Sequence, residues 1–379
     1  MAESVRTPIP APLPQPASGG PILWLRENLC SSWANTALTV LALWLIYSLA
    51  SAVLGWAVLD ATWQGQDGSD CTRAGAGACW PFVRAWFGQF MYGRYPDAER
   101  WRVNLTYALA LAGLIPLMIP QVPHKLWSTV YLLVVFPVLA VILLAGGVFG
   151  LTHVPTDLWG GLLVTLVISS TGIAAALPLG ILLALGRRSP MPVVRWLSIG
   201  FIELVRGVPL ITVLFMASVM LPLFLPEGWT IDKLVRALIM VALFSAAYLA
   251  EVVRGGLQAI PRGQFEAADA LGLSYRQKMG LVVLPQALKL TIPGIVGTCI
   301  GLFKDTSLVL IIGIFDLLGI AQTASASPTW LSPATPMTAY VVAGVIFWIF
   351  CFGMSRYSQM LERRLAAGGD RALAKPAYD

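Results

Sequence analysis

Long apolar runs make up about half of the chain, and more polar segments separate them. A run of roughly 20 apolar residues is what an α-helix needs to cross the hydrocarbon core of a bilayer. Apolar run length and flanking charge together predict about eight such spans, at 34–58, 104–120, 128–150, 160–186, 197–223, 234–258, 291–315 and 338–357. The pattern therefore predicts an all-α, polytopic membrane protein.

Composition agrees with this prediction, and the charge positions predict an orientation. Charged residues are 12% of the chain, whereas a soluble domain usually carries about 25%. Lys and Arg beside a span tend to stay in the cytoplasm, and here they follow every second span: Lys125, Arg187, Arg188, Arg195, Arg262, Arg276, Lys278, Lys289, Arg356, Arg363 and Arg364. The loops 151–159 and 316–337 contain neither residue type. We therefore predict an N-in, C-in topology, and the net charge of +6 reports this asymmetry, not affinity for nucleic acid.

The chain changes character between its third and fourth spans, and four parts are expected. Residues 1–33 are rich in Pro and small residues and lack the apolar core of a cleaved signal, which predicts a disordered cytoplasmic tail. Residues 34–155 form an accessory region with three helices and a periplasmic loop, 59–103. Residues 156–365 form a core of five helices that holds nearly all the intramembrane charges, and 366–379 form a cytoplasmic tail.

Two of the five cysteines, Cys71 and Cys79, fall in the loop 59–103. If this loop faces the oxidising compartment of a bacterium, a small closed disulfide loop is expected. Two unpaired surface thiols are the alternative. The other three cysteines lie in or beside apolar spans and are expected to serve as small apolar packing residues.

Several patterns of enzymes and metal sites are absent from the sequence. No GxxxxGK[ST] phosphate loop occurs, so this chain is not expected to bind and hydrolyse ATP. Neither HExxH nor GxSxG occurs, and two histidines, His124 and His153, are too few for a His-rich metal site. We therefore expect a chain that is not an enzyme, with no catalytic residues, no metal and no cofactor of its own.

The segment 261–285 is the most polar long stretch in the second half of the chain, and its first half predicts a short helix. Pro261 suits a first helical turn, where its missing N–H would be unpaired in any case. Gly272 suits the left-handed position at which a helix ends. The residues between them carry a short apolar stripe at helical spacing.

The second half of this segment predicts another capped helix. Ser274 and Gln277 have the spacing of a capping box, in which each satisfies a free backbone group near the other. Pro285 disfavours helical geometry in the residue before it. The second helix is therefore expected to stop at Leu284.

Three interpretations of these two helices are open: DNA recognition, an ordinary connecting loop, and a surface for a protein partner. A DNA-recognition helix needs exposed side chains that read bases and a basic face. Residues 281–284 are instead apolar and lead back toward the membrane. Connections between helices are usually short, and this one contains two capped helices. The pattern therefore favours a partner surface.

The spacing within 261–285 resembles the EAA loop in the membrane subunits of bacterial ABC importers. That pattern is EAA, three residues, Gly, nine residues, Ile, any residue and Leu-Pro. Here it is occupied by Glu266-Ala267-Ala268, Gly272, Val282 in place of Ile, and Leu284-Pro285. The stretches IELVRGVPL and FKDTSLV resemble the polar amino acid branch of these permeases, and the match spans 160–365. The loop text CTRAGAGACW resembles the larger membrane subunits of general L-amino acid transporters.

The resemblance implies a function and a set of partners. The permease would translocate L-amino acids, whether polar, acidic, amide or broad in range, across a bacterial inner membrane by alternating access. Its EAA loop would insert into a groove on a cytoplasmic ATPase subunit that holds ATP and Mg²⁺; the loop residues here are Glu266, Ala267, Ala268, Gly272, Ser274, Leu284 and Pro285. A periplasmic amino-acid-binding protein would deliver the substrate. The permease would pair with itself or with a homologous subunit, surrounded by lipid and without nucleic acid.

Ionisable residues inside apolar spans are costly and are usually functional or paired. Two pairs stand three residues apart, on one helical face each: Glu203 with Arg206, and Glu251 with Arg254. Each pair is either an interhelical or interfacial ion pair near a membrane surface, or part of a gate that rearranges when ATP binds. Lys304 and Asp305 lie deeper, after a glycine-rich approach. We expect them to line the translocation path, because a zwitterionic substrate needs both signs of charge.

Gly207 and Pro209 predict a local break in the fifth span. Broken helices at membrane depth usually border a cavity or another helix that satisfies the freed backbone groups. A simple structural kink is the alternative.

Two rival functions use the same features differently. A secondary transporter driven by an ion gradient needs no cytoplasmic coupling segment and usually shows internal repeats, whereas this chain has the segment and shows no convincing repeat. A membrane-anchored helix-turn-helix regulator would not place its DNA-binding segment between two spans. The sequence therefore favours the permease.

Overall fold

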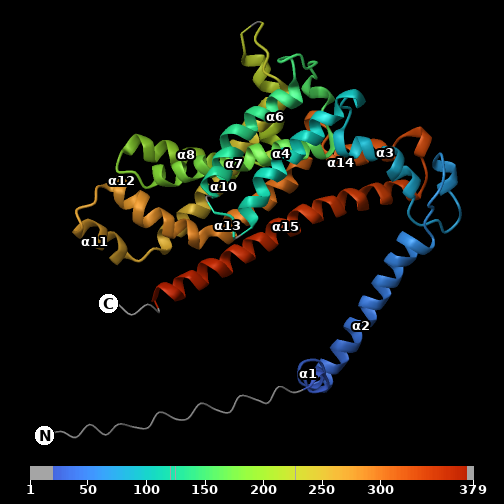
Figure 1. Ribbon diagram of the computed structural model, residues 1–379, viewed down its shortest axis with the longest axis horizontal. Helices are drawn as coiled ribbons and strands as arrows, with labels where there is room; N and C mark the ends of the chain where they lie inside the picture. The colour runs from blue at the N-terminus through green and yellow to red at the C-terminus, as the bar shows by residue number, and fades with distance from the viewer. Residues whose placement is uncertain (1–19, 120, 124, 227, 374–379) are drawn as a thin grey trace. The chain divides into compact units, whose positions relative to one another are not determined.

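The computed structural model of the protein describes residues 20–119, 121–123, 125–226 and 228–373. Within these residues the chain forms α-helices joined by shorter 3-10 and π-helical turns, and its β-structure is limited to isolated bridges. The chain divides into two compact units. The first comprises the residues up to Thr62 together with Ala74–Ala78, and the second comprises Trp63–Arg73 together with the chain from Cys79 onward. Figure 1 labels the main helices.

The first unit contains a short helix, α1 (Pro21–Leu29), and a long apolar helix, α2 (Trp33–Leu54), which continues as the π-helical turn η1 (Gly55–Leu59). Ser32 starts α2, because its hydroxyl accepts a hydrogen bond from the Asn35 amide at 3.2 Å. With η1 included, this helix is long and apolar enough to cross a membrane.

Helix α1 occupies residues 21–29 of the segment 1–33, for which a disordered tail stays a prediction. Residues 1–19 lie outside the described part of the chain, but Pro21 stands in the first turn of a helix, where its fixed φ suits helical geometry. The Asn28 side chain donates a hydrogen bond to the Trp24 carbonyl at 2.9 Å and so supports the last turn. The proline-rich composition of residues 1–33 as a whole did not reveal that residues 21–29 form a helix.

The second unit contains the remaining helices. Its longer helices are α3 (Trp80–Tyr92), α4 (Arg100–Met118), α5 (Lys125–Val130), α6 (Phe136–Ala145), α7 (Gly161–Arg187), α8 (Pro192–Gly207), α9 (Leu210–Phe215), α10 (Lys233–Ala259), α11 (Arg262–Ala270), α13 (Leu284–Asp305), α14 (Leu317–Ser325) and α15 (Ala334–Leu373). Its short turns include η4 (Tyr131–Val135), η6 (Met216–Met220), η7 (Leu221–Phe224), α12 (Tyr275–Gln277), η8 (Lys278–Val283) and η9 (Thr306–Ile312).

The prediction of an all-α protein with about eight spans is confirmed within the described residues. Seven helical runs are long and apolar enough to cross a membrane: Trp33–Leu59, Asp97–Met118, Lys125–Ala145, Gly161–Arg187, Lys233–Ala259, Tyr275–Ile312 and Ala334–Leu365. The bent pair Pro192–Gly207 and Leu210–Phe224 makes an eighth if it counts as one span.

The fifth span is not the continuous helix predicted at 197–223. Helix α8 ends at Gly207, and a new helical segment begins at Leu210, bent by 102° relative to α8. Val208 has extended backbone angles (φ −112°, ψ 136°), as expected for the residue before Pro209. The break expected at Gly207 and Pro209 is therefore present, and it divides this span in two.

The helix of the last span extends beyond the predicted 338–357, and the part that could cross a membrane ends at Leu365. Helix α15 continues to Leu373, so it includes part of the segment 366–379 that was expected to be a tail. No proline stands between Pro336 and Pro376 to interrupt it. Residues 374–379 lie outside the described part of the chain.

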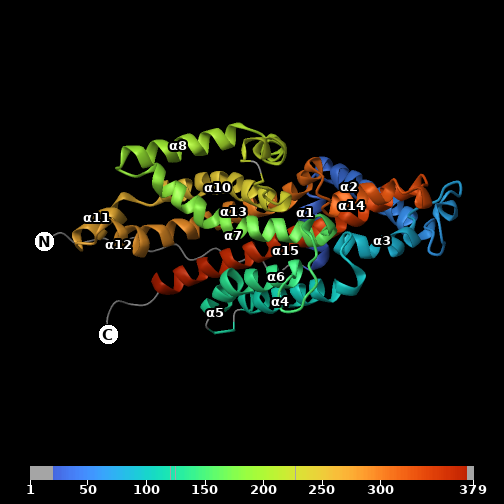
Figure 2. The same ribbon diagram turned by 90° about the horizontal axis from the view of Figure 1, so that it is seen from above.

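Helix α10 packs against both α7 and α13 in the middle of the second unit (Figure 2). A Cβ atom on Gly180 of α7 would lie 2.8 Å from the Leu249 Cβ of α10. A Cβ atom on Gly256 of α10 would lie 2.4 Å from the Thr291 Cγ2 and 2.7 Å from the Ala287 carbonyl of α13. Small residues let membrane helices approach this closely, so these two glycines set the spacing of the three helices.

The second unit also includes α4 and α6 of the predicted accessory region. The fully buried side chain of Arg102, on α4, donates hydrogen bonds to the Thr152 carbonyl and to the Tyr95 hydroxyl, each at 2.9 Å. Val103 and Leu144 belong to one apolar cluster with residues of α7. The division of the chain between 34–155 and 156–365 stays a prediction, because the two compact units are not separated at that point.

Replacing Gly256 by alanine should destabilise the fold, and the same change at Gly255 should not. The added methyl at Gly256 meets backbone of α13, whereas a Cβ at Gly255 has no atom within 4 Å. Overpacking of this kind costs about 1–3 kcal/mol. Thermal unfolding of the detergent-purified protein should show a lower midpoint for Gly256→Ala than for Gly255→Ala. Equal midpoints for the two variants would contradict this account of the α10–α13 contact.

Candidate functional site

The segment 261–285 forms the two helices expected from the sequence. Helix α11 begins one residue after Pro261, and Gly272 follows its end with a left-handed φ of 72°. The Gly272 amide donates to the Asp269 carbonyl at 2.9 Å and the Leu273 amide donates to the Ala268 carbonyl at 3.2 Å. This pair of hydrogen bonds is the Schellman arrangement that satisfies the free carbonyls of a helix end. The predicted role of Gly272 as a C-terminal cap is confirmed.

The second helix starts with the predicted capping box but does not stop where expected. The Ser274 amide donates to the Gln277 side-chain oxygen at 2.9 Å. The helix then passes through the π-helical turn η8 into α13, so the expected end at Leu284 is wrong. The Leu284 amide bonds to the carbonyl five residues earlier. This wider turn accommodates Pro285, whose ring would otherwise clash with the carbonyl four residues before it.

Side chains on both sides of the turn hold α11 in place. Ala268 is 2% exposed and packs inward. Asp269 forms an ion pair with the Lys278 ammonium at 2.5 Å, which connects α11 to η8. Gln264 is joined to Gln286 of α13 by a hydrogen bond of 3.1 Å. The segment is therefore held rigidly to the helices that precede and follow it.

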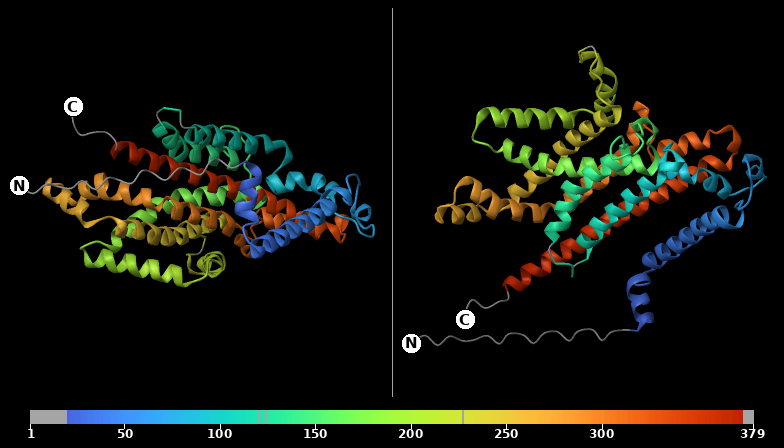
Figure 3. Two further views of the ribbon diagram at one scale, coloured as in Figure 1. Left: turned by 90° about the horizontal axis from the view of Figure 1, so that it is seen from below. Right: turned by 45° about the horizontal axis from the view of Figure 1, so that its top comes forward.

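The opposite surface of the segment is exposed. Glu266 and Ala267 face outward on α11, and two large apolar side chains stand at the turn, with Leu271 78% and Tyr275 51% exposed. We call residues 261–285 the coupling loop and the end of the second unit that carries them the coupling end. Helix α3 lies at the other end (Figure 1). Figure 3 shows the coupling loop, in orange, from two further sides.

Five charged residues gather near the coupling end, and we call them the charged cluster: Arg187, Glu203, Arg206, Glu251 and Arg254. The Glu251 carboxylate, 14% exposed, is at its centre. One of its oxygens accepts from Arg187 at 2.9 Å, and the other accepts from Arg254 at 2.6 Å and lies 3.6 Å from Arg206. The cluster therefore joins three helices: α7, α8 and α10.

The ion pairs of the charged cluster are partly interhelical, which was one of the interpretations open from the sequence, and they include Arg187. Glu251 and Arg254 do pair within α10. Glu203, however, pairs with Arg187 of α7 at 2.9 Å, and Arg206 reaches toward Glu251 instead of Glu203. Spacing of three residues places side chains on one face but does not decide between partners on different helices. Arg187 was missed because its position after a span fitted a purely topological role.

Lys304 and Asp305 stand apart from the charged cluster. They end α13, just before the 3-10 turn η9. Lys304 is exposed and Asp305 is half-buried, and within the described residues neither has an ion-pair partner. Two adjacent charges of opposite sign are thus available at this point of an apolar span.

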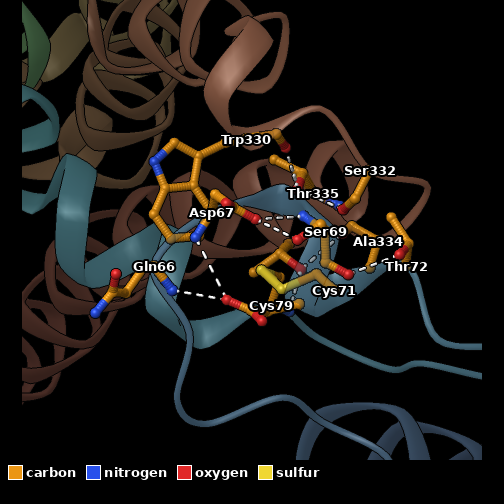
Figure 4. The surroundings of a disulfide bond; sticks show 12 residues. Gln66, Asp67, Ser69, Cys71, Thr72, Cys79, Trp330, Ser332, Ala334 and Thr335 are labelled. Carbon is orange, nitrogen blue, oxygen red and sulfur yellow. Dashed lines mark hydrogen bonds between the residues drawn. A yellow bond between two sulfur atoms is a disulfide. The ribbon is translucent and has the colours of Figure 1, made fainter.

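Cys71 and Cys79 form a disulfide whose Cα atoms are 5.8 Å apart (Figure 4). Both sulfur atoms are buried beside Trp330, in an apolar cluster with residues of α3, α14 and α15. The Cys79 amide donates to the Thr338 hydroxyl of α15 at 3.0 Å. The disulfide therefore closes a small loop before α3, and its packing together with the hydrogen bond to Thr338 holds that loop against α15.

Known proteins resemble the chain over nearly its whole length. Residues 176–367 match a family described as the inner membrane component of binding-protein-dependent transport systems. The inner membrane amino-acid ABC transporter permease protein YhdY of Escherichia coli K12 is 56% identical over 94% of this chain and 96% of its own. The chain belongs to this family of inner membrane components. The Rhodobacter capsulatus permease BztC, named for glutamate, glutamine, aspartate and asparagine transport, is 41% identical over 95% of this chain and 98% of its own.

Among solved structures, the crystal structure of an amino acid ABC transporter with histidines is 28% identical, with a TM-score of 0.48, over 54% of this chain and 92% of its own. As an inner membrane component, this chain is a multi-pass transport subunit and not an enzyme. ABC importer permeases work with an ATPase, which is a separate subunit, and with a substrate-binding protein.

Proposed function

We propose that this chain is the permease subunit of an ATP-driven importer for L-amino acids with polar, acidic or amide side chains, or for a broader range of them. The observation that carries the proposal is the coupling loop, which is held rigidly and leaves Glu266, Leu271 and Tyr275 exposed for a partner. The amino acids for which BztC is named, together with the naming of YhdY as an amino-acid permease, support the substrate class. The bound partners would be the ATPase, a second permease chain and a binding protein.

The orientation we propose places both termini and the coupling loop in the cytoplasm. The disulfide supports it, since such bonds persist in oxidising compartments and not in the cytosol. Cys79 immediately precedes α3, and α3 lies at the opposite end of the second unit from α11 (Figure 2). The coupling loop would therefore face the ATPase while the disulfide faces the periplasm.

The mechanism follows from how the coupling loop is joined to the membrane helices. Helix α11 follows α10 after two residues, and η8 leads into α13 without a break. When two ATPase subunits close around ATP, their movement would be passed to α10 and α13 together. ATP shifts the permease between outward-facing and inward-facing states only as far as it favours one of them. Pairing with a second copy or with a homologous permease would complete the path between the subunits.

Reversing the charge at Glu266 should abolish transport while the protein still inserts into the membrane. Glu266 is exposed and has no ion-pair partner within the described residues, so the change does not disturb the packing of α11. In vesicles with the whole complex, Glu266→Lys should lose uptake and retain less ATPase on purification. Asp157→Lys, an equal charge reversal at an exposed acid outside the coupling loop, is the control. Normal uptake and ATPase retention in Glu266→Lys would overturn the coupling role.

For the translocation path we propose Lys304 and Asp305, whose opposite charges would attract the carboxylate and ammonium groups of an amino acid. The charged cluster would act as a gate or as an interfacial lock. Lys304→Ala and Asp305→Ala should each raise the apparent KM for uptake by about tenfold or more, since a hydrogen bond to a charged group contributes ~1.5–3 kcal/mol. Lys289→Ala, an exposed lysine of the same helix, should behave like the unchanged protein. Unaltered KM and rate in all three variants would remove Lys304 and Asp305 from the path.

A further inference from the structure

Two neighbouring arginines at the end of α7 reach in different directions. We call Arg187 and Arg188 the arginine pair. The Arg187 guanidinium uses a single nitrogen, Nη1, to donate to Glu203 of α8 and to Glu251 of α10, each at 2.9 Å. Arg187 therefore connects α8, the first half of the bent span, to the helix that leads into the coupling loop.

Arg188 contacts the coupling loop itself. Its Nη1 donates to the Leu257 carbonyl, near the end of α10, at 3.1 Å. Its guanidinium carbon lies 5.7 Å from the centre of the Phe265 ring on α11. A guanidinium at this distance over an aromatic face is attracted by the ring electrons. The end of α7 thus holds the coupling helix through one side chain and α8 through the next.

The packing beneath the arginine pair leaves little freedom for independent movement. A Cβ atom on Gly186 would lie 2.3 Å from the Ser198 hydroxyl, so α7 and α8 are in close contact immediately before the pair. Ala184 of α7, Ile202 of α8 and Val253 of α10 belong to one buried apolar cluster, which Phe265 joins. The polar contacts therefore lie over a continuous apolar contact between the same helices.

We propose that the arginine pair are positioning residues that make α8 move with the coupling helix α11. A displacement of α11 would act on Phe265 and Arg188, pass to the end of α7, and reach α8 through Arg187 and Glu203. Helix α8 is the first half of the span that bends by 102° at Val208, so its displacement would change that bend. The proposal rests on the proposed function, because it gives the route by which ATPase closure reaches a span that does not adjoin the coupling loop in sequence.

A double-mutant cycle tests the connection in the complete transporter, reconstituted with its ATPase and binding protein. Arg187→Gln and Glu203→Gln should each lower the amount of amino acid imported per ATP hydrolysed by at least about fivefold, the lower range of coupling between sites. The double variant should be no worse than Arg187→Gln alone, because that substitution already removes the contact with Glu203. Arg188→Gln and Phe265→Leu should show the same non-additive pattern. ATPase retention on purification should stay normal in Arg187→Gln, Glu203→Gln and Arg188→Gln, which lie outside the coupling loop.

Arg195→Gln is the matched control, because Arg195 is an exposed arginine of α8 whose side chain has no ion-pair partner within the described residues. It loses the same charge and should keep the import ratio. Arg187→Lys and Arg188→Lys, which retain a cation, should recover part of the ratio. Additive losses in the cycles, or losses explained by less assembled complex, would show that the arginine pair merely supports the fold and would overturn the proposal.

A distance measurement gives a readout that does not depend on transport. Spin labels at Gly200→Cys on α8 and Gly263→Cys on α11 have open space for their side chains, once Cys30, Cys299 and Cys351 are replaced by alanine. The distance between the labels should be the same without nucleotide and in the vanadate-trapped complex. The distribution of distances between the labels should become broader in the Arg187→Gln, Arg188→Gln double variant. A distance that changes between the two states in the otherwise unaltered complex would overturn the joint movement.

The outcomes separate this proposal from the proposed function. If the unaltered complex hydrolyses ATP without importing amino acids, the proposed function fails whatever the arginine variants do. If it imports them normally and the arginine variants equal Arg195→Gln, the function stands and the joint movement of α8 and α11 is wrong.

Discussion

Helix α10 approaches α7 and α13 at distances that glycine permits, and the arrangement of the coupling end depends on that contact. Inside a bilayer the lipid tails are as apolar as the side chains, so membrane helices associate through close packing more than through burial from water. Gly180 and Gly256 allow this packing on the two sides of α10. As a result, Glu251 and Leu257 on α10 lie next to the end of α7, where Arg187 and Arg188 reach them.

Apolar packing positions the helices at the coupling end, and polar contacts then join their side chains. A single charge in or near an apolar span is costly and normally has a partner, and Glu251 has three guanidinium groups within 4 Å. The coupling loop continues from the same helix, with its turn fixed by Gly272 and by the ion pair between Asp269 and Lys278. A rigid, partly apolar surface joined directly to the spans is what a subunit needs if a separate ATPase is to move it.

The sequence predicted those features that depend on neighbouring residues. The existence of the apolar spans, the left-handed Gly272, the capping box at Ser274 and the break before Pro209 all follow from local chemistry, and each is present. Features that depend on three-dimensional packing were missed or wrong. A π-helical turn accommodates Pro285 and lets the helix continue. The partner of Glu203 lies on another helix, because the packing of α7 against α8 decides which charged side chains meet.

The central claim, that the coupling loop is the surface that binds an ATPase, can be tested by a cross-link. Leu271→Cys and Leu223→Cys are equally exposed positions at 78%, inside and outside the coupling loop. In a complete transporter that imports amino acids, a short bifunctional cross-linker should join Leu271→Cys to the ATPase subunit and leave Leu223→Cys unlinked to it. Absence of the Leu271→Cys product in an active complex, or equal products from both positions, would contradict the account.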